Sequence, residues 1–121
     1  MFVSAKIAPP NSLLLVAGTG GGEIPESFGG AMIASTSTCI AIGCRSEADG
    51  ETEVILGRAE EIDPGDNPCF EDFLETPTRR ILIRTVLGDT LLEAPVPDVR
   101  TGLRIWLNDN AEPDRIMIGI L

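Results

Sequence analysis

Apolar and polar residues alternate along much of this chain with a period of two, the pattern that β-strands produce when one face is buried. The pattern is clearest between residues 79 and 107. There Ile81 and Ile83 share one parity, while Arg80 and Arg84 take the other. This stretch is therefore predicted to form the strands around which the rest of the chain is organised.

Gly88-Asp89 interrupts the alternation and predicts a tight turn, because glycine adopts positive φ without a Cβ clash. Residues 90–94 are then the returning strand of a hairpin. Pro95 and Pro97 lack the N–H that a sheet requires, so the chain is expected to leave the sheet or follow its edge there. A third strand is predicted beyond them, where alternation resumes at Leu103, Ile105 and Leu107.

Similar patterns predict further short strands on both sides of this stretch, at residues 3–7, 12–17, 38–45, 53–60 and 116–120. Asp49-Gly50 is a strong hairpin signal, so the strands that flank it are predicted to pair with each other.

One short helix is predicted over residues 68–75. Asn67-Pro68 is typical of a helix start, since asparagine caps the N-terminus and proline suits the first helical position. Phe70, Phe73 and Leu74 then recur at helical spacing.

Seven to nine short strands separated by turn signals predict an all-β fold, either an antiparallel β-sandwich or a partly closed barrel, with the one short helix. Parallel pairing is not expected, because it needs long crossover connections. The 121 residues are predicted to form a single domain, residues 1–121, with enough aliphatic side chains for one core.

The formal net charge of −10 is concentrated in one quarter of the chain. Eleven acidic residues and a single base lie between Ser46 and Glu75, whereas the remaining residues are balanced. Such a segment repels nucleic acid and anionic membranes and attracts a basic protein, with an attraction that salt weakens. The alternative is a solvated face that only maintains solubility. The acidic residues predicted to contact a basic partner are Glu47, Asp49, Glu51, Glu53, Glu60, Glu61 and Asp63.

Trp106 and Arg104 are predicted to add to this contact surface. Their parity is opposite to that of Leu103 and Ile105, which places them on the outer face of their sheet. A tryptophan beside an arginine is typical of interface hot spots. Burial of Trp106 beneath residues 18–30 is the alternative.

The cysteine count favours reduced thiols. Cys39, Cys44 and Cys69 are an odd number, unlike a disulfide framework, so a cytoplasmic location is expected. All three are predicted to be small buried residues, with Cys39 and Cys44 on opposite faces of one strand. No signal-peptide pattern and no apolar run of about 20 residues is visible, so no membrane contact is expected.

The residues that catalysis or cofactor binding would require are missing. The chain has no histidine, which excludes Ser–His and Cys–His nucleophiles. The glycine loop at 18–22 lacks the third glycine of a dinucleotide site and the lysine of a P-loop. The alternating acids at 47–53 do not have EF-hand spacing. No catalytic residue, cofactor or metal ligand is predicted, and the chain is not expected to be an enzyme.

Three functions remain. The preferred one is a non-catalytic interaction module, of the inhibitor or immunity type, that docks a basic protein. The second is a homo-oligomeric assembly protein whose sheet edges pair between copies. The third is a binder of a small ligand or Ca²⁺. The order of elements in an acidic, β-rich chain of this size resembles the competence protein J type of nuclease inhibitor, which implies the first function. The resemblance includes no shared motif and assigns no role to any residue.

Overall fold

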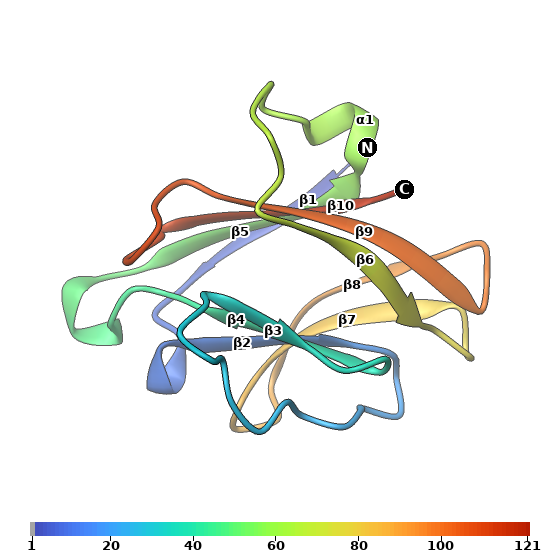
Figure 1. Cartoon of the computed structure of the whole chain (residues 1–121), viewed down its shortest axis with the longest axis horizontal. Coiled ribbons are helices and arrows are strands. Elements are labelled where there is room, and N and C mark those ends of the chain that lie inside the picture. Colours follow the sequence, from blue (N-terminus) through green and yellow to red (C-terminus); the bar gives the residue numbers. More distant parts are fainter. Residues whose placement is uncertain (1) are drawn as a thin grey trace.

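A computed structural model describes residues 2–121, which form two five-stranded sheets packed face to face (Figure 1). In spatial order, the first sheet contains β1 (Phe2–Ile7), β5 (Thr52–Arg58), β10 (Arg115–Ile120), β9 (Arg100–Leu107) and β6 (Phe70–Glu75). The second contains β3 (Ile33–Ser35), β4 (Cys39–Gly43), β2 (Leu13–Ala17), β7 (Arg80–Thr85) and β8 (Thr90–Pro95). The predicted all-β sandwich is confirmed.

Helical structure in the described residues is short. It consists of α1 (Ala59–Ile62) and two 3-10 turns, η1 (Pro10–Ser12) and η2 (Glu47–Asp49). Every helix within residues 2–121 is too short or too polar to cross a lipid bilayer.

The core lies between the inner faces of the two sheets. Ile81, Ile83, Leu103 and Ile105 are all fully buried there, which confirms the period-two pattern of residues 79–107. Burying a branched aliphatic side chain stabilises a fold by about 1.5–3 kcal/mol. The two sheets are therefore held together mainly by aliphatic contacts across the sandwich.

Strand pairing is antiparallel throughout the described sheets except between β5 and β10, which are parallel. Their register pairs Val54 with Ile116 and Leu56 with Ile118, and all four residues are buried. The exception arises because β6, β7, β8 and β9 lie between the two strands in the chain and cross between sheets. The expectation of antiparallel pairing assumed that a parallel connection requires a long crossover helix. In this fold, four strands form that connection instead.

The predicted hairpin and edge crossing in residues 79–107 are confirmed. β7 and β8 pair around a turn in which Gly88 has a φ of +92°. β8 is an edge strand of the second sheet and ends at Pro95, after which the chain crosses to the first sheet as β9.

Residues 46–52 do not form the predicted hairpin, because they connect the two sheets. β4 belongs to the second sheet and β5 to the first. The Ser46 hydroxyl accepts a hydrogen bond from the Ala48 N–H (3.2 Å) at the start of η2, and Gly50 ends the turn with a φ of +121°. Turn chemistry predicts a sharp bend at this place, but it does not specify which strands the bend joins.

Residues 70–75 form the edge strand β6, so the predicted helix at 68–75 is wrong. β6 pairs with β9, and its residue Leu74 is fully buried. Phe70 and Leu74 share a strand face as well as a helical spacing, so the pattern was ambiguous. A helix of two turns is marginal by itself in water, whereas the strand gains a partner and a place in the core.

The helix α1 lies against the outer face of the first sheet at Gly119, a residue without a side chain. A Cβ on Gly119 would be only 2.8 Å from the Cα of Ala59 and 2.9 Å from the ring of Trp106. Gly119→Ala is therefore expected to lower the free energy of unfolding by about 1–3 kcal/mol, the usual cost of overpacking.

Urea unfolding followed by the fluorescence of Trp106, the single tryptophan, measures this loss. Gly20→Ala is the matched control, because no atom lies within 4 Å of a Cβ there. A Gly119→Ala variant as stable as the control would contradict the close packing of α1 on the sheet.

Candidate docking surface

The acidic residues of the 46–75 segment lie at three separate places on the sandwich. One group surrounds η2 and the start of β5, a second lies on and after α1, and the third belongs to β6 (Figure 1). The predicted contact residues thus fall into two groups near opposite ends of β5. They are Glu47, Asp49, Glu51 and Glu53 in the first group, and Glu60, Glu61 and Asp63 in the second.

The first group is enlarged by acids from a distant part of the chain. The backbone N–H of Arg45 donates to the carbonyl of Pro113 (3.2 Å), and that of Glu53 donates to the carbonyl of Asp114 (2.8 Å). These bonds bring the β9–β10 connection beside η2. We call the combined surface the acidic end; its acidic residues are Glu47, Asp49, Glu51, Glu53, Asp109, Glu112 and Asp114.

The β9–β10 connection is ordered by its own side chains. The side-chain Oδ1 of Asn108 accepts hydrogen bonds from the N–H groups of Asp114 (3.1 Å) and Arg115 (3.0 Å). The carboxylate of Asp109 accepts the N–H groups of Glu112 and Ala111, both at 2.8 Å, and these bonds lower the pKa of Asp109. A surface held in place before binding loses less conformational entropy when a partner docks.

Negative charge remains at the acidic end after its ion pairs are formed. Arg45 pairs with Asp114 (3.4 Å), and Arg115 pairs with Glu53 (3.0 Å). Within residues 2–121, no ion pair engages Glu47, Asp49 or Glu51. These three carboxylates are available to cationic groups of another molecule.

The second group contains fewer acids than the acidic end, and an arginine engages one of them. Glu60 forms a 2.7 Å ion pair with Arg58, and both side chains are about two-thirds exposed. Arg104 is half-buried on β9 and forms an ion pair with Glu71 of β6. A hollow of about 330 Å³ lies between α1, Arg104 and the chain end at Leu121. This group is therefore a weaker attractor of a basic partner than the acidic end.

Trp106 is a structural residue on the outer face of the first sheet. It is only 4% exposed and packs against Ala59 and Ile62 of α1. Its Nε1 donates a hydrogen bond to the carbonyl of Asp66 (3.0 Å). The cover is α1 rather than residues 18–30, and the expectation of an exposed Trp106 is wrong. The i, i+3 apolar pair in α1 is the sequence signal that could have indicated this cover.

Loop 18–30 instead covers the outer face of the second sheet. Phe28 packs there against a small cluster formed by Leu15, Cys39 and Ala41. The glycine loop at 18–22 therefore leads into a segment whose residue Phe28 packs on the second sheet.

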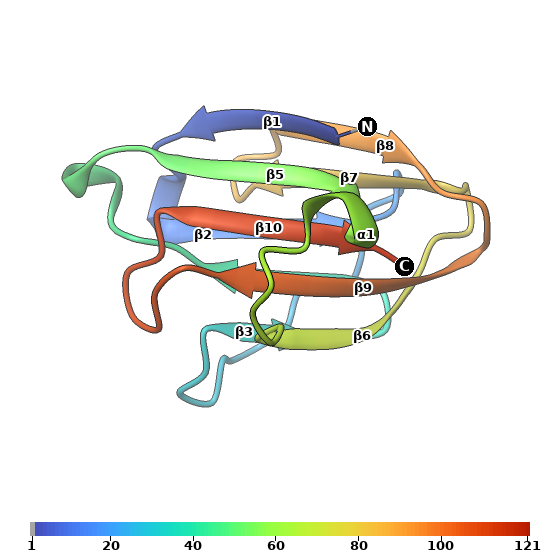
Figure 2. The same ribbon diagram turned by 90° about the horizontal axis from the view of Figure 1, so that it is seen from above.

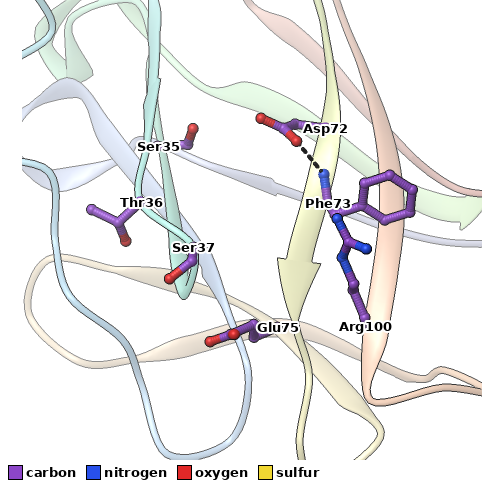
Figure 3. A pocket seen from close by; sticks show the side chains of 7 residues that line it. All are labelled: Ser35, Thr36, Ser37, Asp72, Phe73, Glu75 and Arg100. Atoms are coloured by element: carbon purple, nitrogen blue, oxygen red, sulfur yellow. Dashed lines mark hydrogen bonds between the residues drawn. The ribbon is translucent and has the colours of Figure 1, made fainter.

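A cleft of about 550 Å³ opens where the edge strands β3 and β6 face each other (Figure 3). Asp72 and Glu75 point into it from β6, opposite the hydroxyl-bearing residues 35–37. Phe73 and Arg100 lie on the same side as β6, with the guanidinium 4.1 Å from the ring centre. The sequence interpretation missed these residues because it assigned 68–75 to a helix. The cleft offers carboxylates and hydroxyls for polar contacts.

No site with three converging His, Cys, Asp or Glu side chains occurs among residues 2–121. The alternating acids around Asp49 extend along a turn and a strand start, and they do not surround a common point. Multidentate coordination is what gives Ca²⁺ its affinity for protein sites.

The three cysteines are free, but they differ in exposure. Cys44 lies in the main core, and burial raises the pKa of its thiol to about 12. Cys39 lies on the opposite face, as predicted; burial raises its pKa, and the charge of Arg84 acts in the other direction. Cys69 is exposed, so the prediction that all three are buried is wrong for this residue.

These differences predict the reactivity of the thiols. At mildly alkaline pH, a thiol reagent such as Ellman's reagent should modify one cysteine per folded chain, Cys69, and three per unfolded chain, because the reactive form is the thiolate. Cys69→Ser should abolish the reaction of the folded protein. Rapid modification of more than one thiol before unfolding would contradict the burial of Cys39 and Cys44.

The arrangement of the two sheets assigns the chain to the antiparallel-dominated β-sandwiches. The chain is similar to the crystal structure of ComJ from Bacillus subtilis, an inhibitor of the DNA-degrading activity of NucA, with a TM-score of 0.70. The match covers 99% of this chain and 97% of ComJ, at 10% sequence identity, which establishes a shared fold. No family model and no curated protein sequence matches the chain.

Proposed function

We propose that this protein is a non-catalytic inhibitor that binds a basic protein and blocks its activity. The observation that carries the proposal is the fold shared with ComJ, which extends over nearly the whole of both chains. ComJ inhibits the DNA-degrading activity of NucA. By analogy, the partner of this protein is an enzyme with a basic substrate-binding surface, and a nuclease is the first candidate.

The charge of the chain supports this kind of partner. Enzymes that act on DNA need a basic surface, since contacts to phosphates supply most of the non-specific affinity. A protein with a net charge of −10 is attracted to such a surface and competes with the nucleic acid for it. The proposed mechanism is therefore coverage of the substrate-binding surface, without any chemical step on the inhibitor.

The acidic end is the proposed contact surface. Among residues 2–121, Glu47, Asp49 and Glu51 have no ion pair to break before they meet a cationic group. The neighbouring connection is held by the hydrogen bonds of Asn108 and Asp109. A complementary field of this kind raises the association rate by about 10–10³-fold. The second acidic group, which includes Glu60, lies at the other end of β5. It contributes at the margin of the contact.

A reducing cytoplasm is the proposed location of this inhibitor. Its three cysteines are unpaired, and two of them lie inside the fold. Disulfides rarely persist in the cytoplasm, so a small domain stabilised by its core alone suits that compartment.

Affinity capture from native cells at low salt, followed by mass spectrometry and an activity assay, tests the proposal. The expected partner is a basic enzyme that is released as salt increases. Its activity is expected to fall to a minimum when one equivalent of the inhibitor is added. A captured enzyme that keeps full activity when saturated with this protein would contradict the inhibitory role.

A further inference from the structure

The four edge strands of the sandwich differ in their protection against pairing with another chain, which is the main hazard of a sheet edge. β3 is short, with three residues. β8 ends in Pro95, and its pairing with β7 contains a register shift. Short strands, prolines and irregular register are all features that limit pairing with a further strand.

β6 is protected by hydrogen bonds to its outward N–H groups. The carboxylate of Asp72 accepts the N–H of Phe73 (2.7 Å). The N–H of Glu75 donates to the carbonyl of Ser37 on the facing sheet (2.9 Å). An incoming strand would have to displace both bonds, and Asp72 also points a charge into the cleft beside the strand (Figure 3).

β1 is protected less than the other three edges, and its one charged side chain is Lys6. It pairs with β5 in unbroken register over all six residues, and it contains neither proline nor glycine. Figure 2 shows it at the border of the first sheet, beside β8 of the second. In the part of the chain that the structure describes, no strand pairs with the other side of β1. β1 is therefore the edge at which strand addition meets the least obstruction.

The side chains on and beside β1 are apolar and exposed. Phe2 is 54% exposed and Val3 is 43% exposed. Together with Ala94 and Pro95 of β8 and Ile120 of β10, they line a groove of about 310 Å³. Neighbouring exposed apolar side chains beside an open edge are typical of a protein interaction site.

The local charge favours a second copy of this chain as the occupant. The groove contains one base, Arg58, and one acid, Glu93, so it lacks the negative excess of the acidic end. Antiparallel pairing about a two-fold axis brings the Phe2 end of one strand to the Lys6 end of the other. An aromatic ring then meets a cation, and the two lysines stay apart.

We propose that two copies associate through β1 and form one continuous ten-stranded sheet across a two-fold axis. Phe2 and Val3 of each copy become covered, together with the groove between β1 and β8. The acidic ends carry most of the repulsion between copies, so added salt strengthens the dimer by screening it. This dependence is opposite to that expected for the complex with a basic partner, and the dimer does not depend on the proposed inhibitory function.

Sedimentation velocity of the protein without an N-terminal tag, at high micromolar concentration and in moderate salt, tests the dimer. The expected mass is twice the 12.9 kDa of the chain. Val3→Lys is expected to give the monomer mass, because it places a charge in the contact on both copies. Val99→Lys is the matched control, since Val99 is a valine of similar exposure (55%) outside the groove, and it should remain dimeric. A monomeric wild-type protein, or a dimeric Val3→Lys variant, would overturn the proposal.

Amide hydrogen exchange on the unmodified chain tests the same contact without a substitution. On raising the protein concentration, amides of residues 2–7 are expected to exchange more slowly, while those of the β3 and β6 edges remain unchanged. Concentration-dependent protection at β6 instead of β1, or no change at either edge, would show that β1 is not the contact.

Discussion

Replacing Ile118 with aspartate is expected to leave the chain unfolded at neutral pH. Ile118 is 0% exposed on β10, a central strand between β5 and β9. Removing a buried aliphatic side chain costs about 2–5 kcal/mol. The new carboxyl must also be neutralised, with a pKa shift of up to about 5 units at about 1.4 kcal/mol each. The total is comparable with the about 5–15 kcal/mol by which a domain is stable.

Circular dichroism and the Trp106 fluorescence measure this effect. Ile105→Asp should behave in the same way, because Ile105 is equally buried and is paired with Ile118 in the β9–β10 register. Ile24→Asp is the matched control and should remain folded, since Ile24 is 56% exposed. Folded, soluble variants at both core positions would contradict the inward parities assigned to β9 and β10.

Neutralising Glu47, Asp49, Glu51 and Glu53 together, as the amides, is expected to weaken binding of the basic partner by 10-fold or more while leaving the fold intact. These side chains project from η2 and from the start of β5, outside the core. Replacing their carboxylates with amides therefore changes the electrostatic field at the surface and leaves the core untouched. Loss of a complementary field lowers the association rate by about 10–10³-fold. Surface plasmon resonance with the captured partner separates the association rate from the dissociation rate.

A control variant separates location from total charge. Neutralising Glu23, Glu26, Asp89 and Asp98 removes the same number of acids from other parts of the chain. This variant should bind with nearly unchanged affinity. Equal losses in both variants would mean that net charge alone governs binding, and that the acidic end is no specific contact surface.

Alternation along the sequence is sufficient to predict most strands of this fold, because one buried face imposes it locally. Ile81, Ile83, Leu103 and Ile105 follow it without exception. The alternation does not indicate which strands pair with each other, because pairing depends on contacts between distant residues. For this reason the parallel β5–β10 pair and the connection at Asp49-Gly50 were not predictable from local signals.

The error at 68–75 has a different cause. Phe70 and Leu74 are four residues apart, a spacing that places them on one face of a helix and equally on one face of a strand. Pairing with β9 decided between the two. The same error removed Asp72 and Glu75 from consideration, although they line the cleft between β3 and β6.

The candidate docking surface is only half visible in the sequence. Glu47, Asp49 and Glu51 lie at alternate positions within five residues and are conspicuous. Asp109 and Glu112 join them through backbone hydrogen bonds between two distant loops, and no spacing rule indicates such a contact. Trp106 was misplaced for a related reason, since the short α1 that covers it lies far away in the chain.

The dependence of partner affinity on salt concentration tests the central claim most directly. If the acidic end holds a basic enzyme, titration calorimetry should show the affinity falling steeply as salt rises, because salt screens the attraction. The variant without the carboxylates of Glu47, Asp49, Glu51 and Glu53 should show a much shallower fall. An affinity that stays constant between low and high salt, in both proteins, would contradict the account.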